Sequence, residues 1–318
     1  MSKLFNLFLN ENMKIYRRAR TWMLVVLLVL TTIAFLVAQQ YTVKPSQVAS
    51  SDWRTNVQQQ ITNDQKMLDN LGTNTDRKPR LEARVKLNQY HLDHNIPPTD
   101  QTLWGNMLKA SSLVMVVTVF TVIIAAESVA GEFSGGTIKM LLIRPTSRSK
   151  ILLSKYLSTL VFSVLLFVIL FISAFVVSGA LQGFQDVGVP YVYASSDGIL
   201  HESNIIQQAV STYLYSSVQM IMIVTLAFMI STVFRSSSIA IALSLVTMFG
   251  GSSIAGFLAQ YNWAKYYLFE NTDLTQYLTG TPMIPGMTLG FSVTVLIVYF
   301  LVFNVLAWVV FKRRDVTA

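Results

Sequence analysis

Six long apolar segments constrain this chain more than any other feature of its sequence. They cover residues 21–38, 107–126, 156–180, 213–234, 239–259 and 291–311. An α-helix needs about 20 apolar residues to cross the hydrocarbon core of a bilayer, and each segment reaches or approaches that length. A soluble protein could bury one or two such helices. Six of them, in a chain with 13% charged residues, predict an all-α polytopic membrane protein with six transmembrane helices.

The first segment could also be read as a secretory signal, because basic residues precede it. Its apolar run is longer than the roughly 7–15 residues of a signal core. No clear cleavage pattern of small residues follows it. We therefore expect an uncleaved membrane anchor.

The distribution of Lys and Arg around the apolar segments predicts their orientation. On the side that holds both termini, basic residues outnumber acidic ones by 14 to four, whereas the other side has 10 basic and 12 acidic residues. Basic loops stay in the cytoplasm, so we expect cytoplasmic termini in a multi-pass protein of the cell membrane, the plasma membrane of a bacterium. The net charge of +8 then reflects topology, and no nucleic-acid partner is expected.

The segments on either side of the first apolar run both predict helices. Residues 1–20 read as an amphipathic interface helix on the cytoplasmic face, with a basic cluster, Lys14–Arg20, that suits anionic membrane lipid or serves as a topology signal. Residues 39–106 predict an extracytoplasmic helical hairpin, because apolar residues recur there at helical spacing around a turn. The hairpin could contact a substrate, a partner or a second membrane subunit, or it could be a cap without a ligand.

Two further outer segments differ from each other in composition. Residues 181–207 form an acidic outer loop, whereas residues 260–290 are rich in aromatic side chains and are broken by Gly and Pro. Because aromatic rings favour the headgroup level, we expect the second segment to be interfacial or re-entrant, ahead of the sixth helix. The fifth apolar run contains small residues that let helices pack closely or line a pathway. These are Gly250, Gly251, Ser252 and Gly256.

The residue patterns that mark catalytic sites are missing from the sequence. It contains no P-loop, no zinc-protease motif, no nucleophile elbow and no pair of carboxylates within an apolar run. The lack of Cys excludes disulfides and thiolate metal sites. His91 and His94 could clamp a metal, but no carboxylate cluster completes such a site, and surface histidines fit better. We expect no enzymatic activity and no metal.

The cytoplasmic loop at 127–155 carries the most information about function. Glu127 and Glu132 follow the second apolar run, five positions apart, so they share a helical face only if the helix is interrupted. Gly135 and Gly136 then free the backbone to turn, and Thr137 can cap a short helix over 138–143. A short, partly apolar helix on a charged cytoplasmic face suits docking into another protein.

This loop resembles that of the permease subunits of ABC-2 type transporters. In that family the loop reads Glu, Gly-Glu, Gly-Thr, a Leu-Leu pair and Pro-x-x-Arg, followed by Lys. The matching residues here are Glu127, Gly131-Glu132, Gly136-Thr137, Leu141-Leu142, Pro145 with Arg148, and Lys155. The six-span layout and the broken aromatic segment extend the resemblance to the whole chain.

The resemblance implies one membrane subunit of an exporter. It implies a second permease subunit, identical or related, and cytoplasmic ABC ATPase subunits that hold ATP and Mg, so this chain would bind no cofactor itself. The substrate would be a drug, an antimicrobial peptide or another amphipathic molecule, with a role in antibiotic resistance. The residues implied in coupling to the ATPase are Glu127, Gly131, Glu132, Gly135, Gly136, Thr137, Ile138, Leu141, Arg144 and Arg148.

Simpler interpretations of the same residues remain open. Glu127 and Glu132 could be ordinary polar residues at a membrane boundary, and the basic residues of the loop could serve topology alone. The alternative function is a membrane sensor or assembly factor that binds through its outer hairpin. A sensor needs no loop for docking an ATPase, so the loop favours the transport subunit.

Overall fold

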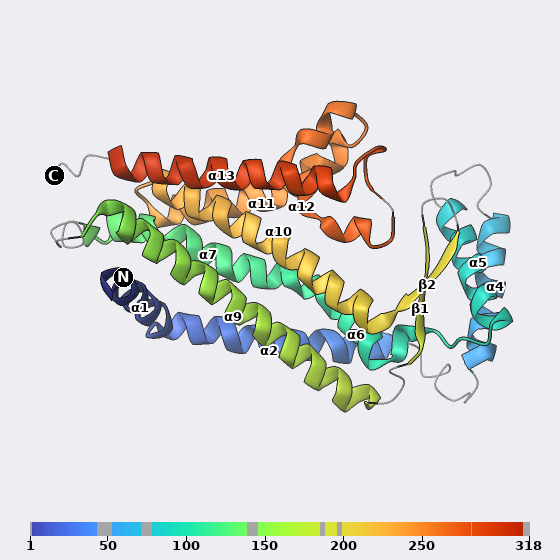
Figure 1. Ribbon diagram of the computed structural model, residues 1–318. Coiled ribbons are helices and arrows are strands. Elements are labelled where there is room, and N and C mark those ends of the chain that lie inside the picture. Colours follow the sequence, from blue (N-terminus) through green and yellow to red (C-terminus); the bar gives the residue numbers. More distant parts are fainter. Residues whose placement is uncertain are drawn as a thin grey trace.

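The computed structural model describes residues 2–42, 53–70, 78–138, 146–184, 188–195, 199–280 and 282–313. These residues are mostly helical, and the prediction of six helices long and apolar enough to cross a membrane is confirmed. The six are α2 (Ala19–Thr42), α6 and α7 (Leu103–Ala110 and Val114–Ser134, joined by the 3-10 turn η2, Ser111–Leu113), α9 (Arg148–Gln182), α10 (Ile205–Val233), α11 (Ser237–Leu258) and α13 (Leu289–Arg313). They form one elongated bundle (Figure 1).

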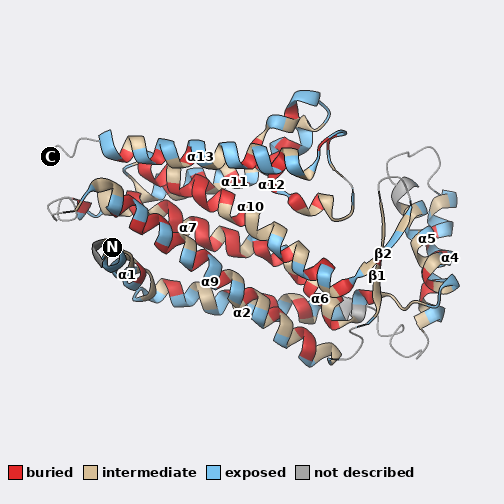
Figure 2. Ribbon diagram, in the orientation of Figure 1, coloured by how far each residue is buried: buried red, intermediate tan, exposed pale blue. Residues whose placement is uncertain are grey.

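Helices α7 and α10 lie at the centre of this bundle. Most of their apolar residues are buried, because α7 packs against α9, α10 and α11, and α10 packs against α13 as well. The outer helices instead expose large apolar side chains such as Val26, Phe257 and Leu301 (Figure 2). Soluble proteins seldom expose apolar surface on this scale, so the exposed bands indicate contact with lipid.

The helices extend beyond the apolar segments that the sequence defines. For example, α9 covers 148–182 where the apolar run covers 156–180. Polar residues at both ends continue the helix, and its 35 residues span roughly 50 Å at 1.5 Å per residue. That length exceeds the hydrocarbon core of about 30 Å, so the ends of α9 reach beyond it.

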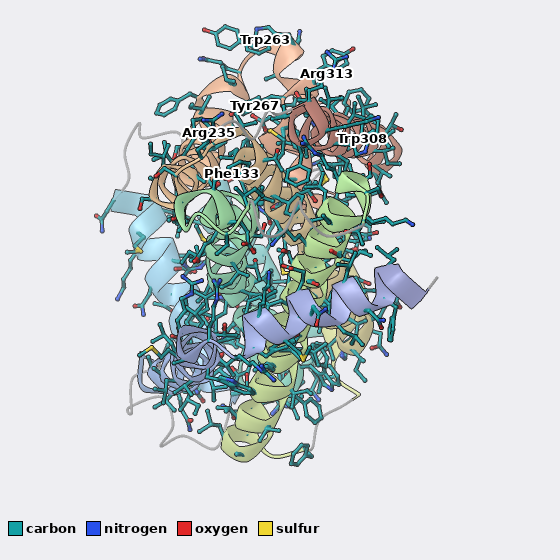
Figure 3. The ribbon with its side chains drawn as sticks, turned by 90° about the vertical axis from the view of Figure 1, so that its left-hand side faces the viewer. Phe133, Arg235, Trp263, Tyr267, Trp308 and Arg313 are labelled. Carbon is teal, nitrogen blue, oxygen red and sulfur yellow. The ribbon has the colours of Figure 1, made fainter. Side chains whose placement is uncertain are left out.

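The amino-terminal segment forms a separate helix, α1 (Ser2–Tyr16), that lies across one end of the bundle. Seen from that end, α1 crosses in front of α9, against which it packs (Figure 3). A turn then leads into α2, where the hydroxyl of Thr21 donates to the carbonyl oxygen of Ile15 at 2.6 Å. The end of α13, the end of α7 and the start of α9 lie at this same end (Figure 1).

The opposite end carries a helical pair and a β-hairpin (Figure 1). The pair consists of α4 (Trp53–Asn70) and α5 (Lys78–Asp93), which pack together, with an Arg84–Asp64 ion pair of 2.6 Å between them. The turn expected at 72–75 lies outside the described residues. The 3-10 helix η1 (Thr99–Gln101) follows the pair and leads into α6.

The β-hairpin corrects the expectation of an entirely helical chain. Strands β1 (Pro190–Ala194) and β2 (Leu200–Asn204) pair antiparallel, with Val192 opposite Glu202. Aromatic and β-branched residues favour strands, and the sequence Tyr-Val-Tyr supplies them within a segment that its acidic residues had marked as a loop. The hairpin contacts α5, where the Tyr90 hydroxyl donates to the Glu202 carboxylate at 2.9 Å.

The aromatic segment ahead of α13 forms three short helices, η3 (Asn262–Tyr266), α12 (Leu268–Thr272) and η4 (Leu274–Tyr277). All five residues of α12 are buried, because this helix lies against α10, α11 and α13. The hydroxyl of Ser292 on α13 donates to the Asn271 side chain at 2.7 Å and lies 2.6 Å from the Tyr277 hydroxyl. These hydrogen bonds fix the broken segment against α13.

Candidate functional site

A group of charged side chains joins α1, the start of α2, the end of α7 and the start of α9. We call it the charge cluster. Its members are Glu11, Lys14, Arg18, Arg20, Glu127, Glu132 and Lys155. The loop residues expected to act in coupling are thus connected to the amino-terminal helix, far away in sequence.

Glu132 and Lys155 form the buried half of the charge cluster. The Lys155 ammonium lies 3.0 Å from Glu132 and 2.7 Å from Glu11, and its side chain is 3% exposed. Lys14 pairs with the same two carboxylates, at 3.0 Å from Glu132 and 2.8 Å from Glu11. The Thr137 hydroxyl also donates to the Glu132 carboxylate. Two carboxylates and two ammonium groups therefore alternate, and each carboxylate contacts both ammonium groups.

Glu127 forms the second half of the charge cluster, at the turn between α1 and α2. Its carboxylate lies 3.1 Å from the Arg18 guanidinium and also pairs with Arg20. Arg18 lies in the turn itself, whereas Arg20 belongs to the first turn of α2. One helix, α7, thus uses its two carboxylates to hold both α1 and the start of α2.

Between the two glutamates, the backbone of α7 contacts a side chain of α10. The Ser231 hydroxyl oxygen, on α10, accepts hydrogen bonds from the backbone N–H groups of Val129 and Ala130, each at 3.0 Å. Helix α7 is continuous from Val114 to Ser134, so Glu127 and Glu132 line the same cavity without the interruption that was expected from their spacing.

Gly131 lies on this face because a larger residue would displace Glu127. A Cβ added to Gly131 would lie 2.9 Å from the Glu127 Cγ atom. Helix α7 ends at Ser134, and Gly136 has a φ of +71°, in the left-handed region that glycine adopts without steric cost. Glycine is therefore needed at 131 for the close approach of the Glu127 side chain, and at 136 for the reversal of the chain after α7.

Electrostatics favours the charged form of Lys14 within the cluster. Burial alone would lower the pKa of its ammonium group, but hydrogen bonds and attraction from Glu11 and Glu132 raise the pKa above its ordinary value. Because the folded-state pKa is the higher one, the stabilisation from Lys14 is complete at neutral pH. It is lost only as the pH rises through that pKa.

The charge cluster lines a cavity of about 500 Å³ between α1, α7 and α9. Of the residues implied in coupling, five line this cavity together. They are Glu127, Gly131, Glu132, Gly135 and Thr137. Within the cluster every carboxylate has a cationic partner, so the arrangement is suited to hold α1 in place rather than to perform acid–base chemistry.

The remaining residues of the coupling prediction lie elsewhere. Ile138 is buried in the main apolar core, and Arg148 donates to the Lys312 carbonyl oxygen at 3.1 Å, which places it beside the end of α13. Of the short helix expected at 138–143, only Ile138 is described. Residues 139–143, which include Leu141, and Arg144 lie outside the described residues. The Thr137 hydroxyl, expected to cap that helix, donates to Glu132.

Sequence reasoning assigned Lys14, Arg18 and Arg20 to topology and lipid contact, and it gave Glu11 no role. All four belong to the charge cluster. Their position in the sequence could have indicated this contact. Basic residues before the first span and acidic residues after the second must lie at the same side of a membrane, where they can pair. Lys155 was already part of the resemblance to the ABC-2 permeases, but its ion pairs with Glu11 and Glu132 were not predicted.

The small residues of α11 have two different environments. A Cβ added to Gly251 would lie 2.2 Å from the Phe269 ring of α12, so this glycine allows close packing. At Gly250 and Gly256 such a Cβ would meet nothing within 4 Å. Of these three glycines, only Gly251 therefore shows the close helix packing that the sequence predicted. Ser252 and Gly256 line a second cavity, at the end of the bundle away from α1.

Comparison with known proteins places the chain among membrane proteins. It is 38% identical to "Uncharacterized protein YhcI" of Bacillus subtilis (strain 168), an alignment that covers 98% of this chain and 99% of the relative. It is 32% identical to "Uncharacterized membrane protein YdbK" of the same strain, over 69% of this chain and 85% of the relative. A family model described as "Protein of unknown function (DUF2705)" matches residues 85–317. Since this match covers most of the chain, the protein belongs to the DUF2705 family.

Proposed function

We propose that this protein is the membrane subunit of an ATP-driven exporter of the ABC-2 type. In this proposal, separate cytoplasmic ABC ATPase subunits bind ATP and Mg and hydrolyse the nucleotide. Two membrane subunits, identical or related, enclose the export path across the cell membrane. The present chain contributes half of that path and a docking surface for the ATPase.

The arrangement of the bundle supports this proposal through its two dissimilar ends. One end of the bundle holds α1, the end of α7 and both ends of the described chain, together with the excess of basic residues (Figure 1). We assign this end to the cytoplasm by the positive-inside rule. The helical pair and the β-hairpin then lie outside, and α12 belongs to a segment that re-enters the membrane from that side.

The charge cluster is the observation that carries the proposal. It joins the loop that resembles the ATPase-docking loop to α1 and to α9, through ion pairs at Glu127, Glu132 and Lys155. A displacement of the end of α7 by a docked ATPase would therefore be transmitted to α1 and α9. A sensor that binds through the outer helical pair has no use for this connection.

Purification of the intact complex from native membranes, through a tag on this chain, tests the proposal. We expect an ABC ATPase to co-purify and to hydrolyse ATP in proteoliposomes. Replacing Glu132 by Lys should reduce this hydrolysis without loss of membrane insertion, because the substitution places a third cation between Lys14 and Lys155. The control is Glu82→Lys, the same change at an exposed position on α5.

One result would contradict the proposal as a whole, and a second would contradict the role of the charge cluster in it. One is a purified complex without an ATPase subunit that still restores transport in vesicles. The other is a Glu132→Lys complex whose ATP hydrolysis equals that of the native complex and of the Glu82→Lys control. The second result would leave transport possible but would remove the charge cluster from its mechanism.

A further inference from the structure

A second large cavity lies at the end of the bundle opposite the charge cluster. It has a volume of about 640 Å³ and is enclosed by α10, α11, the segment around α12 and part of β1. We call it the outer cavity. Cavities that bind small organic ligands have volumes of roughly 300–1,000 Å³, so the outer cavity has room for such a molecule.

Glu270 on α12 is the most unusual residue of the outer cavity. It is 3% exposed, and neither of its carboxylate oxygens has a hydrogen-bond partner among the described residues. Burial of an ionised group without a partner is costly, and nearly all buried polar groups in proteins are paired. A buried carboxylate that none of the described residues pairs is therefore expected to serve a ligand.

The other polar groups around the outer cavity strengthen this assignment. Asp273 adds a second carboxylate, and Gln208, Gln219 and Thr212 on α10 add neutral hydrogen-bonding groups. None of the described residues that line the cavity is Lys or Arg. The cavity thus presents negative charge without a counter-charge, which favours a cation.

The apolar part of the site extends toward the middle of the bundle. An adjoining cavity of about 390 Å³ shares Thr212, Gln219 and Asp273 with the outer cavity. It is lined further along by Met115 and, near the middle of α10 and α11, by Ile223 and Met248. Glu270 thus lines only the outer cavity, whereas Met115, Ile223 and Met248 line only the adjoining one, together with Ser and Thr side chains.

A metal ion fits this site less well than an organic cation. Ca²⁺ takes six to eight oxygen ligands and Mg²⁺ takes six, whereas no group of three or more metal-binding side chains exists among the described residues. The volume and the apolar lining also exceed what a metal ion uses.

We propose that the outer cavity binds an amphipathic organic cation, whose ammonium group pairs with the Glu270 carboxylate and whose apolar part lies along the adjoining cavity. The proposal rests on the proposed function only in taking this cation for the exported substrate. Binding itself requires neither the ATPase nor transport, so the site can be tested in the isolated chain.

The test compares two fluorescent ligands that differ in one charge. Dansylcadaverine carries a primary ammonium group, and its N-acetyl derivative is neutral. Both are titrated into the full-length protein in nanodiscs of zwitterionic lipid, with empty nanodiscs as background. We expect the native protein to bind the amine at least about tenfold more tightly than the acetylated ligand. Glu270→Gln should abolish this preference, and the control Glu82→Gln should keep it.

Each outcome decides for or against the site. Equal affinities of the native protein for the two ligands would overturn the proposal without any variant. A Glu270→Gln protein that keeps the tenfold preference would overturn the role of Glu270. If the preference depends on Glu270 but vesicles with the ATPase do not export the amine, the binding site stands and the assignment of this cation as the exported substrate fails.

Discussion

Replacing Lys155 by Met should release α1 from the rest of the bundle. The Lys155 side chain is 3% exposed and contacts Glu11 at 2.7 Å and Glu132 at 3.0 Å. Without it, two carboxylates that are 14% and 15% exposed share Lys14 as the nearest remaining cation. Removing one partner from a buried ion pair costs about 3–5 kcal/mol.

Hydrogen exchange measures this release directly. Each 1.4 kcal/mol changes an equilibrium constant tenfold, so a cost of about 3 kcal/mol raises the population of detached α1 roughly 100-fold. We expect backbone amides of α1 to exchange faster by about that factor, because exchange from an open state follows its population. The measurement uses the full-length protein in detergent micelles, where no bilayer holds α1 in place.

The matched control is Lys109→Met, at the opposite end of the bundle. The Lys109 ammonium lies 3.9 Å from an exposed Asp100 carboxylate, a pair worth at most about 1 kcal/mol. The Lys109→Met substitution should leave hydrogen exchange in α1 unchanged. Native exchange rates in α1 of the Lys155→Met protein would refute the reasoning. Equal acceleration in α1, α10 and α13 would refute it too, because it would show general unfolding instead of local release.

Three further predictions concern single contacts. Gly251→Leu should lower the folded yield in fluorescence-detected size-exclusion chromatography, by a cost of about 1–3 kcal/mol for overpacking against an aromatic ring, whereas Gly256→Leu should give a normal yield. Ser231→Ala should lower the unfolding temperature, because two backbone N–H groups of α7 lose an acceptor worth about 1–2 kcal/mol, and the exposed Ser253→Ala should not. Glu270→Gln should raise the unfolding temperature, because an unpaired buried carboxylate is removed, and an unchanged or lower temperature would show that the native carboxylate is paired.

The helical part of the fold was predictable, because each spanning helix has an apolar run of its own in the sequence. The ends of the helices were harder to predict, since α9 continues beyond its apolar run on both sides. The β-hairpin was missed because its strands are five residues each and the acidic residues around them are also typical of loops.

The site was predictable in part. Glu127 and Glu132 stood out because charged residues are rare near the end of an apolar run. Their cationic partners did not, since basic residues near a membrane boundary are already explained by topology. Glu270 gave no signal at all, because an acidic residue in an aromatic, broken segment reads as a surface group. Only its burial on α12 distinguishes it.

Helix α10 connects the charge cluster to the outer cavity. Near one end, Ser231 accepts hydrogen bonds from the backbone of α7 between the two glutamates, and near the other, Gln208 lines the outer cavity. The helix is continuous over its 29 residues, so these positions lie roughly 35 Å apart along one rigid element. Coupling over such distances needs an element whose position both sites can bias. A change in α7 at its contact with Ser231 would shift α10 as a whole, and with it the wall of the cavity that faces Glu270. In the proposed exporter, the physical route from ATPase docking to cation release is a displaced helix, which needs no chain of side-chain rearrangements across the membrane.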